Sequence, residues 1–326
     1  MAGGQPSPSR ALTSPPARTR LAVGQGLGHT AVMLRIRPVP GNRQRLDGGA
    51  MFGNVPKALW RRWCDSDERG RIELAGRALL VEDGRHRILL ETGTGFFFEP
   101  KLRERYGVSG EANQLLESLS ALSLGDADID IVILSHLHFD HVGGLLTDYR
   151  PDVPSQLLFP NARYLVTRDA FERAIRPHPR DRASFVPEVP GLLQDSGRLV
   201  LIDGTQRPDD LLDERYRFRV FEGHTPGMLL TEVTGQAARV VCCGDLVPGT
   251  PWLHVPVTMG YDRYAERAVN EKGEFLATAV DQDWLLFFTH DPVVALTRIE
   301  RSPEGRYAAV GSLGDDCTGL DLDQAP

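Results

Sequence analysis

Three histidines and one aspartate fall within six residues, at His136, His138, Asp140 and His141. They directly follow an apolar, strand-like stretch at residues 129–134, which places them at the end of a buried strand. Without a cation, polar groups packed this closely would be partly desolvated and would compete for hydrogen bonds. A divalent metal turns the same nitrogens and oxygen into ligands at about 2.0–2.2 Å. The run therefore predicts a metal site.

Three other predicted strands also end in residues that can bind a metal. His224 lies in a Gly-His-Thr-Pro-Gly turn after residues 218–222, Asp245 follows the apolar residues 239–242, and His290 ends the apolar stretch at residues 284–289. Functional sites are often built on loops that a rigid scaffold holds at strand ends. We therefore expect His224, Asp245 and His290 to belong to the same site as the histidine run.

Short strands with helices between them must position these residues. The patterns predict strands at residues 32–38, 72–81, 86–90, 129–134, 162–167, 199–202, 218–222, 228–234, 239–242, 284–289 and 307–310. They predict helices at residues 112–122, 168–175 and 266–279, a glycine-rich loop at 46–53 and a surface excursion at 176–197. Strands and helices alternating in both halves favour an α/β sandwich of two helix-covered sheets.

Composition narrows the class of protein. The chain has 326 residues, of which 41% are hydrophobic and 25% charged, as in ordinary globular proteins. No apolar run reaches the roughly 18–20 residues of a membrane helix, so we expect no membrane association. The formal net charge of −7 argues against a general nucleic-acid binder. The four cysteines form no CxxC pair, which fits a reducing compartment, and we expect a cytoplasmic protein.

The start of the chain differs from the rest. Residues 1–46 contain seven arginines and no acidic residue, and the first thirty are rich in proline, serine and glycine. We expect residues 1–31 to be a disordered basic extension and residues 32–326 to form a single domain. A true translation start at Met33 and an organelle-targeting segment are the alternatives.

The motifs together resemble the metallo-β-lactamase-fold hydrolases over residues 33–312. The residues that carry this resemblance are His136, His138, Asp140, His141, His224, Asp245 and His290. The segments at residues 47–53, 56–60 and 260–262 are similar to the branch that holds the quorum-quenching N-acyl homoserine lactonases. The resemblance implies a four-layer αββα sandwich, an α/β fold of the α+β type, with the site on loops along one edge.

The resemblance also implies a dinuclear centre. His136, His138 and His224 would hold one metal, Asp140, His141 and His290 the second, and Asp245 would bridge them. Two divalent ions are expected, zinc in the first place, with iron, manganese or cobalt as alternatives. A hydroxide shared by the metals would attack a lactone or ester carbonyl, and Asp140 would relay a proton to the leaving oxygen.

Some positions depart from the family pattern. Glu91 stands where the family has an aspartate that supports the site, and Pro248 stands where a lactonase tyrosine is expected. Tyr261 is the candidate to replace that tyrosine, so Asp140, Asp245 and Tyr261 are the predicted catalytic residues. We expect a monomer or homodimer that opens small lactones or esters, above all N-acyl homoserine lactones. The alternatives are a phosphotriesterase like methyl parathion hydrolase, a thioesterase like glyoxalase II, and a metal-binding scaffold without activity.

Overall fold

Most strands of the protein belong to two large sheets in the computed structural model, which describes Met1 and residues 33–324. The seven-stranded sheet has the order β15 (Leu320–Asp321), β1 (Arg35–Pro40), β4 (Arg77–Glu82), β5 (Arg87–Leu90), β6 (Ile131–Ile133), β7 (Arg163–Thr167) and β8 (Leu199–Ile202). The six-stranded sheet has the order β14 (Tyr307–Leu313), β13 (Leu296–Arg301), β12 (Leu285–Phe287), β11 (Arg239–Cys242), β10 (Met228–Thr234) and β9 (Tyr216–Phe221). Pairs β5/β6, β6/β7, β7/β8 and β11/β12 are parallel.

Apolar side chains on both faces of these strands build two cores. In β6, Ile131 and Ile133 enter one core while Val132 enters the other, because successive side chains of a strand point to opposite faces. In β12 of the other sheet, Leu285 enters the same core as Ile131. That core contains residues of both sheets but none of an α-helix, so it lies between the sheets, whereas the other includes Leu115 and Phe275 from helices and lies under them. This explains why the central strands are continuously apolar in sequence.

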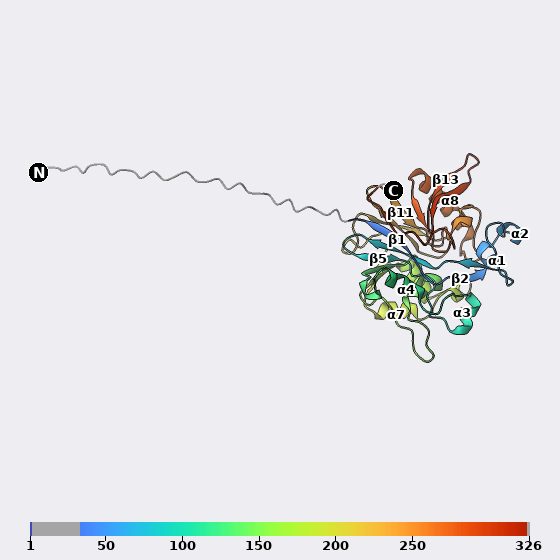
Figure 1. Ribbon diagram of the computed structural model, residues 1–326, viewed down its shortest axis with the longest axis horizontal. Helices are drawn as coiled ribbons and strands as arrows, with labels where there is room; N and C mark the ends of the chain where they lie inside the picture. Colours follow the sequence, from blue (N-terminus) through green and yellow to red (C-terminus); the bar gives the residue numbers. More distant parts are fainter. Residues whose placement is uncertain (2–32, 325–326) are drawn as a thin grey trace. The chain divides into compact units, whose positions relative to one another are not determined.

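Helices lie between the strands along the chain, and some of them pack on the two large sheets. The helices are α1 (Gly48–Phe52), α2 (Lys57–Trp60), α3 (Pro100–Tyr106), α4 (Gln114–Ala121), α5 (Phe139–Val142), α6 (Arg168–Ile175), α7 (Val189–Asp195) and α8 (Ala265–Asp281). Helix α4 packs on β1, α6 on β7, and α8 on β13. Figure 1 shows α8 on the side of β11 and β13, and α4 and α7 on the side of β1 and β5. The predicted αββα sandwich is confirmed.

Several local predictions are wrong. Residues 46–53 are not only a loop, because Asp47 caps a short helix α1 by accepting a hydrogen bond from the Ala50 amide at 2.8 Å. Residues 72–81 are two strands: β3 (Arg71–Leu74) pairs with β2 (Gln44–Asp47) in a small separate sheet, whereas β4 pairs with β1. The excursion at residues 176–197 contains helix α7, and helix α3 and strand β13 were not expected.

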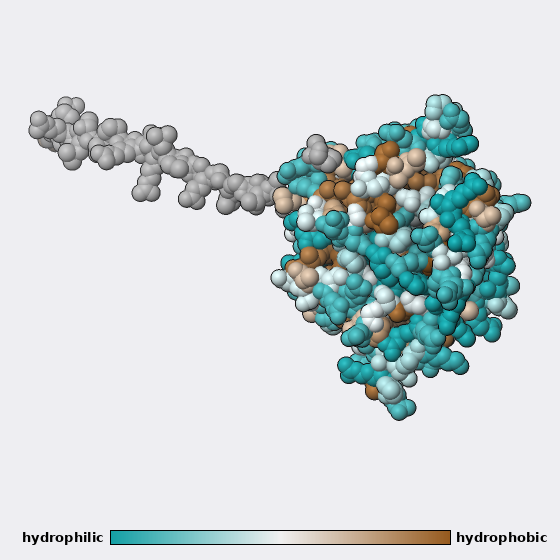
Figure 2. Space-filling view, turned by 45° about the vertical axis from the view of Figure 1, so that its right-hand side comes forward, coloured by the Kyte–Doolittle hydropathy of each residue, from teal (hydrophilic) through white to brown (hydrophobic). Residues whose placement is uncertain are grey.

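The predictions for residues 1–31 fall almost entirely outside the described residues, so the disordered extension and its alternatives stay predictions. Within residues 33–324, no helix is both long enough and apolar enough to cross a membrane. Figure 2 shows hydrophilic residues over most of one face, with apolar residues in small groups between them. Scattered apolar groups of this kind are normal for a globular surface.

Candidate metal centre

The predicted site residues meet where strands of both sheets end. Strand β6 leads into His136 and His138 and then into α5, which carries Asp140 and His141. In the second sheet, β11 and β12 run parallel and are followed by Asp245 and His290, and the turn between β9 and β10 carries His224. A backbone hydrogen bond from Leu229 to Ser135, 2.8 Å long, joins the two sheets beside the site. All seven residues are buried.

The first cluster contains three histidines and one aspartate. His136 Nε2 lies 2.9 Å from His138 Nδ1, and His224 Nε2 lies 3.2 Å from the same His138 atom. Asp245 Oδ2 is 3.2 Å from His224 Nε2 and 4.0 Å from His136 Nε2. Four potential ligand atoms therefore face one another across a small space.

The second cluster contains the other three predicted residues. His290 Nε2 lies 3.2 Å from His141 Nε2, and Asp140 Oδ2 lies 3.6 Å from His290 Nε2. Asp245 Oδ1 is 3.2 Å from His290 Nε2 and 3.3 Å from His141 Nε2. The two carboxylate oxygens of Asp245 thus face different clusters, which is the arrangement expected of a bridging ligand.

These clusters fit divalent metal ions. Ligands about 2.0–2.1 Å from a tetrahedral ion lie about 3.3 Å apart, close to the separations between the facing nitrogens. Among residues 33–324, Asp245 Oδ1 is buried without a hydrogen-bond partner, and a bound cation would satisfy it. Imidazole and carboxylate ligands together suit zinc and other first-row metals. The donor set is therefore that of a metal site.

Contacts behind the histidines fix which ring nitrogen faces the centre. His136 Nδ1 contacts Ser135 Oγ at 2.9 Å, and His290 Nδ1 contacts the Ala75 carbonyl at 2.8 Å. His224 Nδ1 contacts Asp262 Oδ1 at 2.8 Å. Such partners orient metal-binding histidines and select their tautomer.

Glu91 supports the site as expected from its position. Its Oε2 lies 3.1 Å from His141 Nδ1, and its Oε1 accepts a hydrogen bond from the Ser135 amide at 2.9 Å. Glu91 has a φ of 70°, which is unusual for a residue with a side chain. The two contacts hold this strained backbone at the end of β5.

Histidine charge in this site depends on how close each ring lies to carboxylates. Burial, followed by neighbouring histidines, lowers the pKa of His136 and His138 well below the ordinary value. Burial also opposes charge on His141, but Asp245 and Glu91 outweigh it and raise its pKa. In the same way, although burial acts against ionisation of Asp245, the histidines around it lower its pKa well below the usual range. Without a cation, protons must be distributed among these groups.

A cavity of about 200 Å³ opens onto the clusters. Tyr106 from α3 and Tyr261 both line it, and the rest of the lining includes the apolar side chains of Leu46, Met51 and Met259. Burial, followed by the charge of Asp140, raises the pKa of Tyr261 to about 12. Tyr261 is therefore a protonated phenol near the ligands, as a hydrogen-bond donor must be.

A groove of about 470 Å³, lined mainly by apolar residues but also by Glu99 and Glu188, adjoins this cavity. The two share Tyr106, Phe139 and Ala183, and the groove extends along Phe98 and Phe185. Phe98, Tyr106 and Phe139 pack ring to ring, with centroids 4.8–5.3 Å apart. The excursion at residues 176–197 supplies Ala183 and Phe185, so it forms a wall of the site.

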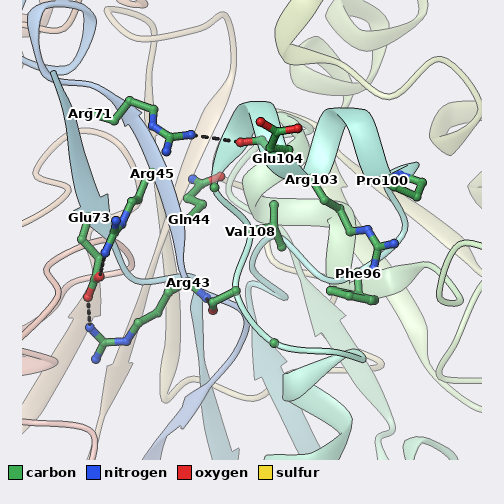
Figure 3. Close-up of a pocket in the computed structure, with 13 residues that line it drawn as sticks. Arg43, Gln44, Arg45, Arg71, Glu73, Phe96, Pro100, Arg103, Glu104 and Val108 are labelled. Atoms are coloured by element: carbon green, nitrogen blue, oxygen red, sulfur yellow. Dashed lines mark hydrogen bonds and ion pairs between the residues drawn. The ribbon is translucent and has the colours of Figure 1, made fainter. Parts of the chain in front are cut away.

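Another hollow, of about 510 Å³, has walls from β2 and α3 but contains none of the predicted site residues. Figure 3 shows its arginines turned in different directions. Arg45 contacts Glu73 at 3.3 Å, Arg71 donates to the Glu104 carbonyl at 3.0 Å, and Arg103 lies over the Phe96 ring (Figure 3). Their guanidinium groups have partners and do not converge, so the metal clusters are the stronger candidate site.

Sequence reasoning missed three residues of the site. Gln44 Nε2 donates to Asp140 Oδ2 at 2.8 Å, Asp262 holds His224, and Tyr106 lines the cavity. Asp262 lies next to Tyr261 in a segment that the sequence singled out, so a signal for it existed. Gln44 and Tyr106 lie in strand β2 and helix α3, which the sequence patterns did not predict, and only the packing of these elements against the site reveals them.

Comparison with known proteins identifies the family of the chain. The profile of the metallo-beta-lactamase superfamily matches residues 71–290. The chain belongs to this superfamily and is a metal-dependent hydrolase of that class.

Solved structures share the fold. A probable metal-dependent hydrolase from Staphylococcus aureus is 25% identical, with a TM-score of 0.76, and the match covers 87% of this chain and 97% of that one. AidC, a dizinc quorum-quenching lactonase, is 21% identical with a TM-score of 0.67, over 85% and 94% of the chains. A variant of AiiA from B. thuringiensis, with N-decanoyl-L-homoserine bound at its active site, is 18% identical with a TM-score of 0.59, over 80% and 94%. At these identities the two lactonases support the fold alone.

Proposed function

We propose that the protein opens lactone or ester bonds at a dinuclear metal centre and that N-acyl homoserine lactones are its substrates. The observation that carries the dinuclear proposal is the position of Asp245, whose two oxygens face the two clusters at 3.2–3.3 Å. His136, His138 and His224 would hold one ion, Asp140, His141 and His290 the other, and zinc is the first expectation. Bound divalent ions would supply the Lewis acidity that activates water for attack on a carbonyl.

The surrounding residues would orient the substrate and handle protons. Tyr261 would donate its phenol hydrogen to the substrate carbonyl, taking the role that Pro248 cannot fill. The Asp140 carboxylate, held by Gln44, would accept the proton that the attacking water gives up and pass it to the alkoxide that leaves when the ring opens. The chain offers no Gly-x-Ser-x-Gly nucleophile motif, and this mechanism needs no side-chain nucleophile.

The shape of the site supports a substrate with a small polar head and an apolar chain. The cavity of about 200 Å³ can hold a ring near the clusters, and the groove beyond Tyr106 and Phe139 offers apolar contact to an acyl chain. Burial of each methylene there would contribute about 0.8 kcal/mol to binding. Longer acyl chains are therefore expected to lower KM until the groove is filled.

One experiment tests this proposal. The full chain is purified, its metal content is measured, and it is assayed with acyl homoserine lactones, aryl esters, paraoxon and S-lactoylglutathione. We expect close to two transition-metal ions per chain and the highest kcat/KM with the lactones. Fewer than one tightly bound ion would contradict the dinuclear centre. Preferred turnover of paraoxon would favour a phosphotriesterase, and preferred turnover of S-lactoylglutathione would favour a thioesterase. Either result would contradict the lactonase proposal.

A further inference from the structure

Lys272 is a buried charge beside the metal centre. It lies on α8 and is only 3% exposed, on the same helix face as the buried Ala268, Phe275 and Leu276. Burial lowers its pKa from 10.5 to about 8. An ammonium group on the apolar face of a helix is costly, and an apolar side chain there would usually be more stable.

The composition of the chain makes this lysine unusual. Only three of its 37 basic residues are lysines, at positions 57, 101 and 272, and the other two are exposed. Arginine serves almost everywhere else. At position 272 a compact ammonium is used instead of a planar guanidinium, which differs in shape and in hydrogen bonding. This suggests a specific local requirement.

Lys272 is connected to the predicted metal ligand His224 through residues 257–262. Its ammonium donates to the backbone carbonyl of Val257, at the start of the segment at residues 257–262. At the other end of that segment is Asp262, whose charge acts on Lys272. Asp262 Oδ1 contacts His224 Nδ1 at 2.8 Å, and its Oδ2 accepts a hydrogen bond from the Met259 amide at 2.8 Å.

The same segment is joined to the His224 turn by its backbone. Arg263 donates its amide to the His224 carbonyl at 2.9 Å, and Tyr264 donates to the Gly223 carbonyl at 2.8 Å. The segment also carries Tyr261. A shift of residues 257–262 would therefore move both the support of His224 and the phenol in the cavity.

We propose that Lys272 is a positioning residue of the metal centre, whose ammonium fixes residues 257–262 so that Asp262 holds the His224 ring with Nε2 toward Asp245. This inference rests on the proposed function, because it assumes that His224 binds a metal ion. Lys272 acts through Val257 and Asp262 and does not contact the centre itself. A partner that holds a metal ligand directly, as Asp262 holds His224, typically changes metal affinity about 10- to 100-fold, and Lys272 acts through that partner.

The test compares Co²⁺ binding by the full chain and by the variants K272M and K101M. Methionine keeps most of the side-chain volume but removes the charge and the donor, and Lys101 is an exposed lysine on α3 that serves as the matched control. Affinity is measured by competition with a chelator, and geometry by the visible absorption of bound Co²⁺. We expect K272M to weaken the affinity of one Co²⁺-binding step about 10-fold or more and to change the visible absorption of the bound Co²⁺. K101M is expected to behave like the wild type.

Two further variants show whether Lys272 acts through Asp262. K272Q keeps a donor for the Val257 carbonyl and is expected to retain part of the Co²⁺ affinity. If K272M does not fold, the Co²⁺ affinity and absorption of K272Q test the inference in its place. The double variant K272M/D262N is expected to bind Co²⁺ no more weakly than D262N alone. Wild-type affinity and absorption in folded K272M, whatever its activity, would overturn the inference alone. Failure of the wild type to bind Co²⁺ would instead overturn the proposed function.

Discussion

At the scale of single residues, Asp245 is the residue that lies between both histidine clusters. Its side chain is 8% exposed, and each of its oxygens lies 3.2 Å from a histidine of a different cluster. Asn at this position keeps the shape but offers one oxygen and no charge. We therefore expect D245N to lower kcat at least about 100-fold and to lower the metal content, with the fold intact by circular dichroism. Wild-type turnover by a folded D245N protein would contradict the bridge.

Tyr261 is the second residue whose role can be tested directly. Because its pKa is raised to about 12, the phenol keeps its proton at neutral pH and can donate to a substrate carbonyl. Loss of a hydrogen bond to an oxygen that gains charge is expected to cost Y261F about 10- to 100-fold in kcat/KM. The control is Y106F, which removes the other phenol of the cavity. If Y106F shows the loss and Y261F does not, Tyr106 is the donor.

At the scale of elements, the sequence predicted the strands that end at the site but not everything that packs around them. Strand β6 and its parallel neighbours could be predicted from the sequence because both of their faces are buried and their sequences are therefore continuously apolar. The helix α1 was missed because Gly48-Gly49 argues for a loop, although Asp47 could have been recognised as its cap. The break between β3 and β4 depends on which strand each half pairs with, and pairing is a property of the tertiary structure.

The turn after α5 must pass very close to the glycine loop that follows β5. A Cβ at Gly143 would lie 1.9 Å from the Thr94 carbonyl oxygen and 2.7 Å from the Phe97 ring. Backbone cannot easily yield, so G143A must displace α5, which carries Asp140 and His141. We expect a loss of about 1–3 kcal/mol in unfolding free energy and a lower metal content, measured by urea unfolding and elemental analysis.

The control for this prediction is Gly191 in α7. A Cβ there meets no atom of the described part of the chain within 4 Å, so G191A is expected to be neutral or to stabilise by up to about 1 kcal/mol through helix propensity. Equal effects of the two substitutions would show that the close approach at Gly143 is not important.

At the scale of the whole molecule, the motifs predicted which residues meet, and the fold decides how they are held. All seven residues of the predicted ligand set lie together because their strands end at one edge of two packed sheets. Gln44 and Tyr106 come from elements whose own sequences carry no sign of the site, whereas Asp262 lies in the segment at residues 260–262 that the family resemblance singled out. Their contribution appears only after β2, α3 and the segment before α8 pack against it.

Burial of the Lys272 charge also lowers the unfolding free energy of the whole protein. Its pKa is lowered to about 8 in the folded protein from 10.5, with Asp262 partly offsetting the burial. Between these two values the unfolded chain binds more protons at this site than the folded one, so stability rises as pH rises through the window. Below pH 8 the full penalty is present, and a shift of this size corresponds to about 3 kcal/mol.

K272M lacks this penalty but loses the bond to Val257, worth about 1 kcal/mol. We therefore expect K272M to be more stable than the wild type at pH 7, with an advantage that shrinks as the pH approaches 10.5. Urea unfolding of both proteins at several pH values between 7 and 10 measures this difference. A difference that does not change with pH would show that Lys272 is not a buried charge. A variant that is more stable yet binds Co²⁺ more weakly would show that the fold gives up stability at this position to orient His224.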